Sequence, residues 1–251
     1  MIEVKNVTKS FDGKTILHDV SATFETGKTN LIIGQSGSGK TVLIKSIIGL
    51  LMPEKGEILF DGRDIMKMDH NQIKELRKEI GMLFQGSALF DSETVLGNVM
   101  FPLTMFTGMS GAEIKDRAQF CLERVNLKGA GNKYPSEISG GMQKRVAIAR
   151  AIALNPKYLF CDEPNSGLDP RTSIVIDELL SDITHEYNIT TVINTHDMNS
   201  VMEIGEKIVY IHDGRKWWEG TKDDILHADN RELNDFVFAS AMAKRAKLAA
   251  Q

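Results

Sequence analysis

The feature that most constrains this chain is the segment at residues 34–41, which reads Gly-Gln-Ser-Gly-Ser-Gly-Lys-Thr. An apolar, β-rich run precedes it at 29–33, and an apolar segment with helical spacing follows at 42–51. Glycines let backbone N–H groups curve around phosphate oxygens, Lys40 can reach the outer phosphates, and the Thr41 hydroxyl can bind Mg²⁺. A strand, a loop and a helix in this order also aim the positive end of a helix dipole at the phosphates.

This segment therefore predicts a nucleoside triphosphate site. A flexible Gly/Ser linker is the alternative, and the Lys-Thr pair followed by an apolar helix argues against it. The residues expected to bind the phosphates are Gly34, Ser36, Gly37, Ser38, Gly39, Lys40 and Thr41.

The composition suits one large or two small domains. The chain has 251 residues, of which 42% are hydrophobic and 25% charged, and its formal net charge is −4. That charge is not the footprint of a nucleic-acid-binding protein. Cys121 and Cys161 stand among apolar neighbours, so we expect buried free thiols in a reducing compartment. The apolar segments fall short of the roughly 20 residues that cross a bilayer. We therefore expect a cytoplasmic chain, with any membrane crossing made by other chains.

Three further apolar runs, at 80–84, 158–161 and 190–195, are each followed directly by polar residues. Runs of this kind are typical of parallel strands buried on both faces. In open α/β sheets, ligands bind beyond the carboxyl ends of the strands. We therefore expect the polar residues to meet the glycine-rich segment at one edge of a sheet. They are Gln85, Asp162, Glu163 and His196.

These side chains fit phosphoryl transfer, which asks a protein mainly for positioning and charge stabilisation. Asp162 can support the Mg²⁺ ion that Thr41 contacts. Glu163 can orient or deprotonate the attacking water, a role typically worth about 10²–10⁴-fold in rate. Gln85 has donor and acceptor atoms for the metal and the water, and His196 can hydrogen-bond the γ-phosphate. Alone, each residue could belong to an ordinary turn; their shared position at strand ends favours the catalytic interpretation.

A second anion site is suggested by residues 136–145, Ser-Glu-Ile-Ser-Gly-Gly-Met-Gln-Lys-Arg. A strong helical pattern follows at 146–154, so Ser139, Gly140 and Gly141 should begin a helix. Taken alone, the segment is better explained as an ordinary serine cap with a glycine turn.

Together these segments resemble the ATPase subunit of ABC (ATP-binding cassette) transporters, over essentially the whole chain. Residues 34–41 are similar to the family's Walker A motif, Gln85 to its Q-loop, 138–143 to its signature motif, 158–163 to Walker B with the catalytic glutamate, 166–169 to the D-loop, and His196 to the switch histidine. The six motifs occur in the family's order. The signature begins with Ile138 where the family commonly has leucine, a conservative change.

The resemblance implies a P-loop α/β fold with a mainly parallel core sheet, an antiparallel β-subdomain and a helical subdomain. It implies ATP and Mg²⁺ as cofactors, and two subunits that dimerise head to tail around two ATP molecules. In that arrangement Ser139, Gly140 and Gly141 of one subunit complete the site of the other, with Asp169 at the interface. Glu163, His196 and Gln85 would be catalytic, and Thr41, Gln85 and Asp162 would bind the metal. Phe11 stands where the family stacks an aromatic side chain on adenine, although it could equally be a core strand residue.

The resemblance also gives an organisation for the single domain at 1–251. It implies a core with its β-subdomain at 1–85 and 155–225, a helical subdomain at 86–154 and a helical tail at 226–251. An edge strand is expected at 2–7, further strands at 16–24 and 57–60, and turns at 55–56 and 61–62.

Two helical segments are singled out. Residues 111–127 should form a helix with one buried face, made by Ile114, Ala118, Cys121, Leu122 and Val125. Near Gln85, residues 88–90 and 95–103 would line the groove that receives a permease's coupling helix, although about half of these apolar residues are expected to be core. In the tail, one helical face and a following basic group predict a plain terminal helix or a docking segment for a partner or a second protomer. Those residues are Leu233, Phe236, Val237, Ala241, Lys244, Arg245 and Lys247. Membrane-surface binding is a third alternative, which the small number of basic residues disfavours.

Within the family, residues 84–92 and 139–145 look like the Mla-type (maintenance of lipid asymmetry) ATPases. Those serve MCE-protein systems that move phospholipids between the two membranes of Gram-negative bacteria. The match implies a position at the cytoplasmic face of the inner membrane, with a transmembrane permease, an MCE-domain protein, a small regulatory subunit and no nucleic acid. The single cassette in the chain favours a homodimer, with a heterodimer as the alternative. The alternatives are an importer ATPase for amino acids or metal-chelates and, with less support, an ABC ATPase of DNA repair or translation.

Overall fold

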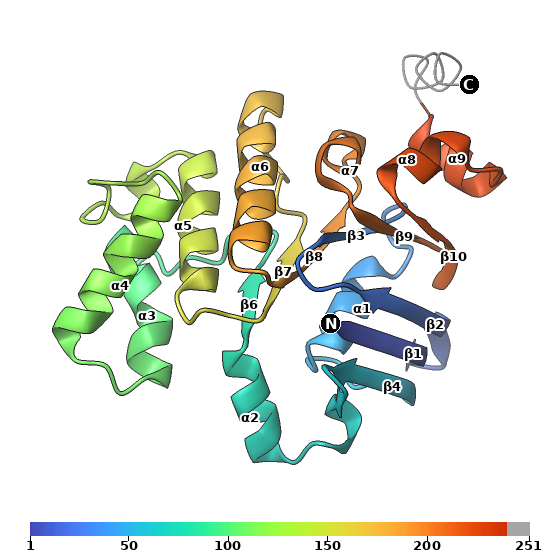
Figure 1. Cartoon of the computed structure of the whole chain (residues 1–251), viewed down its shortest axis with the longest axis horizontal. Coiled ribbons are helices and arrows are strands. Elements are labelled where there is room, and N and C mark those ends of the chain that lie inside the picture. The colour runs from blue at the N-terminus through green and yellow to red at the C-terminus, as the bar shows by residue number, and fades with distance from the viewer. Residues whose placement is uncertain (240–251) are drawn as a thin grey trace. The chain divides into compact units, whose positions relative to one another are not determined.

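The computed structural model describes residues 1–239, and the chain forms two compact units (Figure 1). The first unit joins Met1–Met68 to the chain from Thr190 onward, and the second comprises Asp69–Ile189. The division into a core, a helical subdomain at 86–154 and a helical tail stays a prediction.

An antiparallel sheet forms the early part of the first unit. Its strands run in the order β2-β1-β4-β5, with bounds β1 (Ile2–Phe11), β2 (Lys14–Phe24), β4 (Lys55–Phe60) and β5 (Arg63–Asp64). Strand β1 pairs with β2 on one side and with β4 on the other, so the predicted edge position of residues 2–7 is wrong. Alternating apolar residues reflect one buried sheet face, which interior and edge strands share. The expected turn at 55–56 is also wrong, because both residues belong to β4.

The remaining strands of the first unit form a mainly parallel sheet region. Strand β3 (Thr29–Ile33) pairs in parallel with β8 (Thr190–Thr195) and with β9 (Lys207–His212), and β10 (Arg215–Gly220) pairs antiparallel to β9. All residues of β3 and β8 are buried, as expected for parallel strands covered on both faces. The helices of this unit are α1 (Lys40–Ile47), α7 (Met198–Ile204), α8 (Lys222–His227) and α9 (Arg231–Val237), with a short 3₁₀ turn at Ile65–Lys67.

The second unit contains two parallel strands and most of the longer helices. Strand β6 (Ile80–Leu83) pairs in parallel with β7 (Tyr158–Asp162). The helices are α2 (His70–Lys78), α3 (Val95–Phe106), α4 (Gly111–Arg124), α5 (Gly140–Ile152) and α6 (Pro170–Glu186), with a 3₁₀ turn at Pro135–Glu137. Among residues 1–239, no helix is long and apolar enough to cross a bilayer.

Helix α4 shows how local chemistry sets an element's limits. Ser110 caps its N-terminus in a reciprocal capping box with Glu113, which satisfies two otherwise unpaired N–H groups. The helix ends three residues before the predicted limit, because Asn126 adopts a left-handed conformation with φ 56°. The predicted buried face is confirmed at all five positions.

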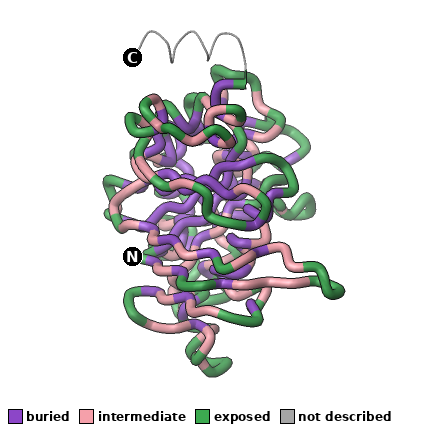
Figure 2. Tube along the Cα trace, turned by 90° about the vertical axis from the view of Figure 1, so that its right-hand side faces the viewer, coloured by how far each residue is buried: buried purple, intermediate pink, exposed green. Residues whose placement is uncertain are grey.

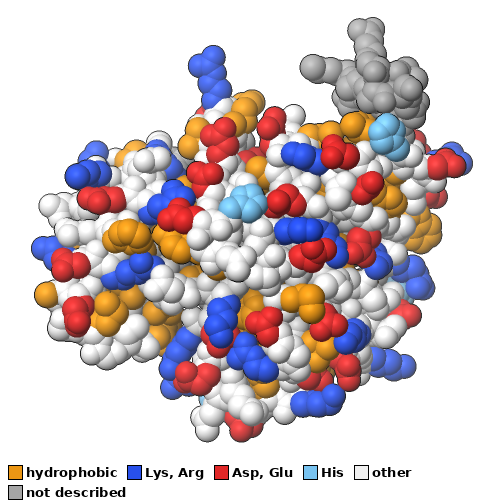
Figure 3. Space-filling model, viewed as in Figure 1, with side chains coloured by type: hydrophobic (Ala, Val, Ile, Leu, Met, Phe, Trp, Pro, Cys, Tyr) orange, Lys and Arg blue, Asp and Glu red, His pale blue; other side chains and the backbone are white. Residues whose placement is uncertain are grey.

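The core consists of aliphatic and aromatic residues from the strands and the inner helix faces, and exposed residues lie on turns and on the outer faces of helices (Figure 2). Cys121 and Cys161 are buried free thiols, as predicted, and burial raises the pKa of both. On the face in Figure 3, acidic and basic side chains are interspersed.

In the tail, Leu233 and Val237 are buried and Phe236 stacks on Tyr210, with ring centroids 5.6 Å apart. Ala241, Lys244, Arg245 and Lys247 lie outside the described residues.

A close backbone contact in the first unit gives a stability prediction. Gly214 has φ +70°, its N–H donates to the Ser38 carbonyl at 3.0 Å, and a Cβ there would lie 2.0 Å from the Ile16 carbonyl oxygen. We expect Gly214→Ala to destabilise the protein by about 1–3 kcal/mol through this clash, in addition to about 1–2 kcal/mol for a left-handed alanine. Thermal unfolding measures the sum.

Gly62→Ala is the matched control for that substitution. Gly62 has φ +80°, and no atom lies within 4 Å of the position that a Cβ would take there, so this variant should show only the conformational cost. Each kcal/mol lowers Tm by about 2–4 °C in a chain of this size. Equal losses in Tm for the two variants would contradict the steric explanation.

Candidate functional site

The glycine-rich segment leaves the carboxyl end of β3 and closes directly onto α1. Gly34 has φ +151°, and a Cβ there would lie 2.2 Å from the Ile211 carbonyl oxygen. Gly39, with φ 105°, occupies the N-cap of α1, where no side chain caps the helix. The first N–H groups of α1 are therefore not covered by a capping side chain, and a helix start of this kind is a natural anion site.

Lys40 lies across this loop rather than out in solvent. It is 6% exposed, and its Nζ donates to the carbonyls of Gly34 at 2.8 Å and Gln35 at 3.0 Å. Ser36 and Gly37 form the exposed tip of the loop, whereas Ser38 is buried. A positive charge held by two carbonyls of this glycine-rich loop suits a polyphosphate tail.

The strand next to β3 brings His196 to the same edge. In the parallel register Ile33 pairs with Thr195, so Gly34 and His196 leave neighbouring strands at the same level. His196 is exposed, and Asp197 then caps α7 by accepting from the Asn199 N–H at 2.9 Å. Within the first unit, the fold therefore brings together the predicted loop and the predicted histidine.

Asn194 is a site residue that sequence reasoning missed. It is 1% exposed near the end of β8, and its Nδ2 donates to the Thr41 hydroxyl at 3.3 Å. This bond orients the hydroxyl predicted to bind Mg²⁺. The signal in the sequence was a polar amide inside the β-rich run Thr-Val-Ile-Asn-Thr, since buried amides in a core strand need a partner.

The second unit presents a corresponding edge. Leu83 pairs with Cys161 in the parallel register of β6 and β7, so Gln85 and the Asp162-Glu163 pair leave adjacent strands together. Asp162 is 8% exposed at the end of β7. Glu163 has φ 50°, a left-handed conformation that non-glycine residues adopt at a cost of order 1–3 kcal/mol and that clusters at functional sites.

The turn after Glu163 connects this edge with Gln85. The Ser166 N–H donates to the Glu163 carbonyl at 3.1 Å, and the Gln85 Nε2 lies 3.5 Å from the Ser166 hydroxyl. Within the second unit, the fold thus brings together three of the predicted residues: Gln85, Asp162 and Glu163.

Asp169 caps a helix of its own chain. Its carboxylate caps α6 by accepting from the backbone N–H groups of Arg171 and Thr172, both at 3.1 Å, and from the Thr172 hydroxyl at 2.5 Å. Hydrogen bonds from Thr172 hold the pKa of this carboxyl below its usual range. The family resemblance places Asp169 at a subunit interface, which stays a prediction.

The signature segment begins α5, as predicted. Ser139 is the N-cap, and its hydroxyl accepts from the Met142 N–H at 3.3 Å. Ser139 and Gly140 are exposed, whereas Gly141 is buried, and a Cβ at Gly141 would lie 2.6 Å from the Thr172 side chain. The exposed start of α5 can therefore receive an anion from outside the subunit.

Phe11 ends β1 with its side chain partly exposed. It is 40% exposed, and Lys9 Nζ lies 5.1 Å from its ring centroid. The alternative that Phe11 is a core strand residue is therefore wrong. An exposed aromatic face beside a cation can stack on a base, so the assignment to adenine remains as a proposal.

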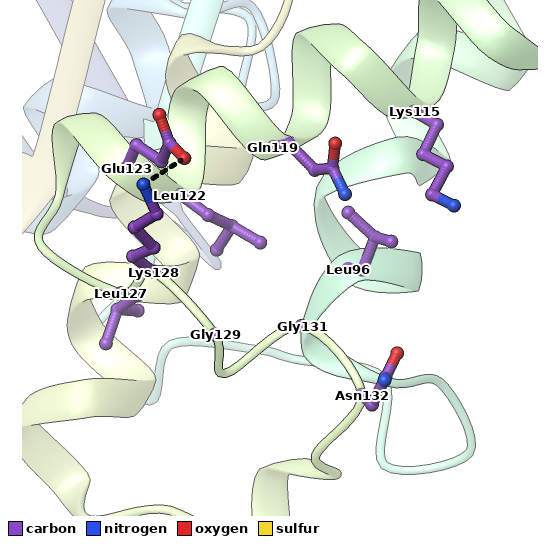
Figure 4. A pocket seen from close by; sticks show the side chains of 10 residues that line it. All are labelled: Leu96, Lys115, Gln119, Leu122, Glu123, Leu127, Lys128, Gly129, Gly131 and Asn132. Carbon is purple, nitrogen blue, oxygen red and sulfur yellow. Dashed lines mark ion pairs between the residues drawn. The ribbon is translucent and has the colours of Figure 1, made fainter.

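A hollow of about 450 Å³ lies in the second unit, between α3, α4 and the turn at 127–132, and Figure 4 shows the side chains that line it. Leu96, Gln119 and Asn132 are among its lining residues, and Lys128 lies 3.6 Å from Glu123 at its rim. None of the predicted site residues lines this hollow.

Magnesium fits the predicted ligand set. Within the described residues, no group of three or more His, Cys, Asp or Glu side chains forms a metal cage. Mg²⁺ is usually bound through one or two protein carboxylates, several waters and the substrate phosphates. The hydroxyl of Thr41, the amide oxygen of Gln85 and the carboxylate of Asp162 are oxygen donors of that kind.

Comparison with known proteins places this geometry in a family. Residues 17–166 match the ABC transporter family model. The chain is 40% identical over 237 residues to the intermembrane phospholipid transport system ATP-binding protein MlaF of Haemophilus influenzae, covering 94% of this chain and 90% of that protein. It is 39% identical to the probable ribonucleotide transport ATP-binding protein mkl of Mycobacterium leprae, covering 94% and 68%. It is 42% identical to the methionine import ATP-binding protein MetN of Carboxydothermus hydrogenoformans, covering 98% and 77%.

Solved structures give the same result. A dimeric post-hydrolysis state of the ATP-binding cassette MJ0796, bound to ADP and Pi, is 36% identical with a TM-score of 0.81, covering 88% of this chain and 99% of that one. The protein cbiO1 from Clostridium perfringens, part of the ABC transporter complex cbiONQ, is 29% identical with a TM-score of 0.85, covering 99% and 97%. The predicted P-loop α/β fold, with its parallel core strands and antiparallel β-sheet, is confirmed. The chain belongs to the ABC transporter family and is its ATP-hydrolysing, ATP-binding subunit.

Proposed function

We propose that this ATPase drives phospholipid transport between two membranes as part of an MCE-type system. The observation that carries the proposal is the pair of segments at 84–92 and 139–145, which resemble the lipid-transport branch. The MlaF relative, whose name states intermembrane phospholipid transport, is matched over 90% of its length. The ribonucleotide and methionine relatives have similar identities, so the cargo needs an experiment.

The site residues have the roles that their positions support. The loop at 34–41 and the N-terminus of α1 bind the phosphates, and Thr41, Gln85 and Asp162 would hold Mg²⁺, which neutralises phosphate charge. Glu163 takes a proton from the attacking water, and His196 hydrogen-bonds the γ-phosphate. Ser139, Gly140 and Gly141 of a second copy complete the site, with Asp169 near that contact.

The partners follow from the same proposal. A homodimer binds a transmembrane permease at the cytoplasmic face of the inner membrane, together with an MCE-domain protein and a small regulatory subunit. The surface offered to the permease includes Phe90 and Phe101, which are 41% and 42% exposed and have ring centroids 4.6 Å apart. Exposed paired aromatics of this kind are typical of protein contacts. Of the predicted groove residues, Val95, Val99 and Leu103 are instead core.

Purification of the tagged chain from its native membranes in mild detergent tests the proposal, with mass spectrometry of the proteins and lipids recovered. We expect a multi-span permease and an MCE-domain protein with bound phospholipid. A permease with a soluble methionine-binding or ribonucleotide-binding protein would overturn the lipid assignment. Recovery without any permease would overturn the transport assignment.

Adenine stacking gives a separate prediction. Phe11→Ala should weaken ATP binding by about 1–3 kcal/mol, the usual value of one base-aromatic stack. Phe120→Ala is the matched control, because Phe120 is 47% exposed on α4 and also lies beside a cation, 5.1 Å from Arg117. Titration with a fluorescent ATP analogue measures both. Equal affinity in the two variants would remove Phe11 from the site.

A further inference from the structure

Two basic side chains of α5 reach the segment that carries Gln85. Lys144 is 4% exposed, and its Nζ donates to the Gln85 backbone carbonyl. Arg150 donates through Nη2 to the Ser87 carbonyl and through Nη1 to the Ala88 carbonyl, both at 2.8 Å. Three carbonyls in four residues are therefore held by charged donors from one helix. Such charge-assisted bonds are shorter and stronger than neutral ones.

The segment that receives these bonds is strained. Ser87 and Ala88 are consecutive non-glycine residues with φ 62° and 47°. Two left-handed residues in a row persist only where the surroundings over-determine them. Arg150 constrains these two residues from α5. Its guanidinium donates to both of their carbonyls and lies 5.7 Å from the Phe90 ring centroid.

The far end of the segment has its own anchor. Asn98, fully buried on α3, accepts from the Phe90 N–H at 2.8 Å and donates to the Phe90 carbonyl at 3.1 Å. The part from Gln85 to Ala88 instead receives its charged donors from α5.

Helix α5 is also the helix that Ser139 begins. Lys144 lies five residues after that serine, and burial lowers the pKa of its amino group, a shift that the charges of Cys161 and Glu163 oppose. The buried Lys144 side chain thus joins the signature helix to the Gln85 backbone within the second unit.

We propose that Lys144 and Arg150 are positioning residues that fix the backbone of 85–88 to the signature helix, so that a contact made at Ser139 sets the place of the Gln85 side chain. The inference rests on the proposed role of Gln85 in ATP hydrolysis. The two residues act through Gln85 and touch no reacting atom. Loss of Lys144 should leave Gln85 present but misplaced, and a displacement of about 1 Å can cost up to 10²-fold in rate.

The bonds from Lys144 and Arg150 to the backbone of 85–88 form a clamp, which is tested by amide hydrogen exchange on the full chain. Lys144→Met and Arg150→Met should both speed exchange in peptides covering 84–90, with exchange elsewhere unchanged. Lys115→Met, which alters an exposed lysine of α4, is the matched control. Unchanged protection of 84–90 in both α5 variants would overturn the proposal, whatever the role of Gln85.

The positioning role is tested by a double-mutant cycle in ATP hydrolysis. Lys144→Met should lower kcat by about 10-fold to 100-fold with little change in ATP affinity, and Lys144→Arg should restore most of the rate. In a Gln85→Ala background, the same substitution should have little further effect. An equal, additive loss in that background, or a loss that follows a lowered Tm, would show a merely structural role and overturn the proposal. If Gln85→Ala alone leaves the rate of ATP hydrolysis unchanged, the proposed role of Gln85 is wrong. Hydrogen exchange in 84–90 still shows whether Lys144 and Arg150 fix the backbone of 85–88.

Discussion

Replacing Glu163 by glutamine should lower the rate of ATP hydrolysis by about 10²–10⁴-fold, the usual contribution of a positioned general base. Glutamine keeps the shape of the side chain but cannot accept a proton from water. Glu163 stands directly after β7 in a left-handed conformation, φ 50°. ATP binding should survive, because the phosphate loop belongs to another segment.

A second expected result of Glu163→Gln is a long-lived dimer in the presence of ATP. Size-exclusion chromatography with light scattering measures that state, and phosphate release measures turnover. Glu178→Gln, an exposed position on α6, is the control for loss of one carboxylate. Normal turnover in Glu163→Gln would remove this residue from the catalytic role.

Replacing Ser139 by arginine should abolish ATP hydrolysis while leaving ATP binding by the isolated chain nearly intact. Ser139 is exposed at the N-cap of α5. A long cationic side chain there should therefore obstruct the approach of the ATP bound to a second copy. The phosphate loop of the same chain is untouched. ATP affinity and the rate of phosphate release, measured on the same preparation, separate the two effects.

Two controls isolate that effect from simple loss of a helix cap. Ser139→Ala removes the cap bond alone, which typically costs about 1 kcal/mol of stability. Ser110→Arg places the same bulk at another serine N-cap, on α4, and should keep its hydrolysis rate. If Ser139→Arg loses binding and turnover equally, the assignment of Ser139 to a second copy's site is wrong.

The strand ends could be predicted because their signal is local. A short run of buried residues followed by a polar residue is visible in the sequence at Gln85, Asp162 and His196. Parallel pairing then brings such ends to one edge, which the registers of Ile33 with Thr195 and Leu83 with Cys161 show in each unit. The start of α5 was predictable for the same reason, since Ser139 is a strong capping residue next to a helical pattern.

Features that depend on distant parts of the chain could not be predicted. Alternating residues in β1 reveal a buried face but not the two neighbouring strands. A lysine in a helix is normally exposed, so nothing near Lys144 in sequence shows that it turns inward to the Gln85 carbonyl. The left-handed conformations of Glu163 and Ala88 are likewise imposed by surrounding structure, because non-glycine residues do not favour them.

The dependence of ATP hydrolysis on chain concentration tests most directly whether a second copy completes each site. Specific activity of the full chain should rise with concentration and level off where sedimentation shows an ATP-bound dimer. Specific activity that stays constant down to concentrations where the chain is monomeric would contradict a site shared between two copies, since one copy would then be a complete enzyme.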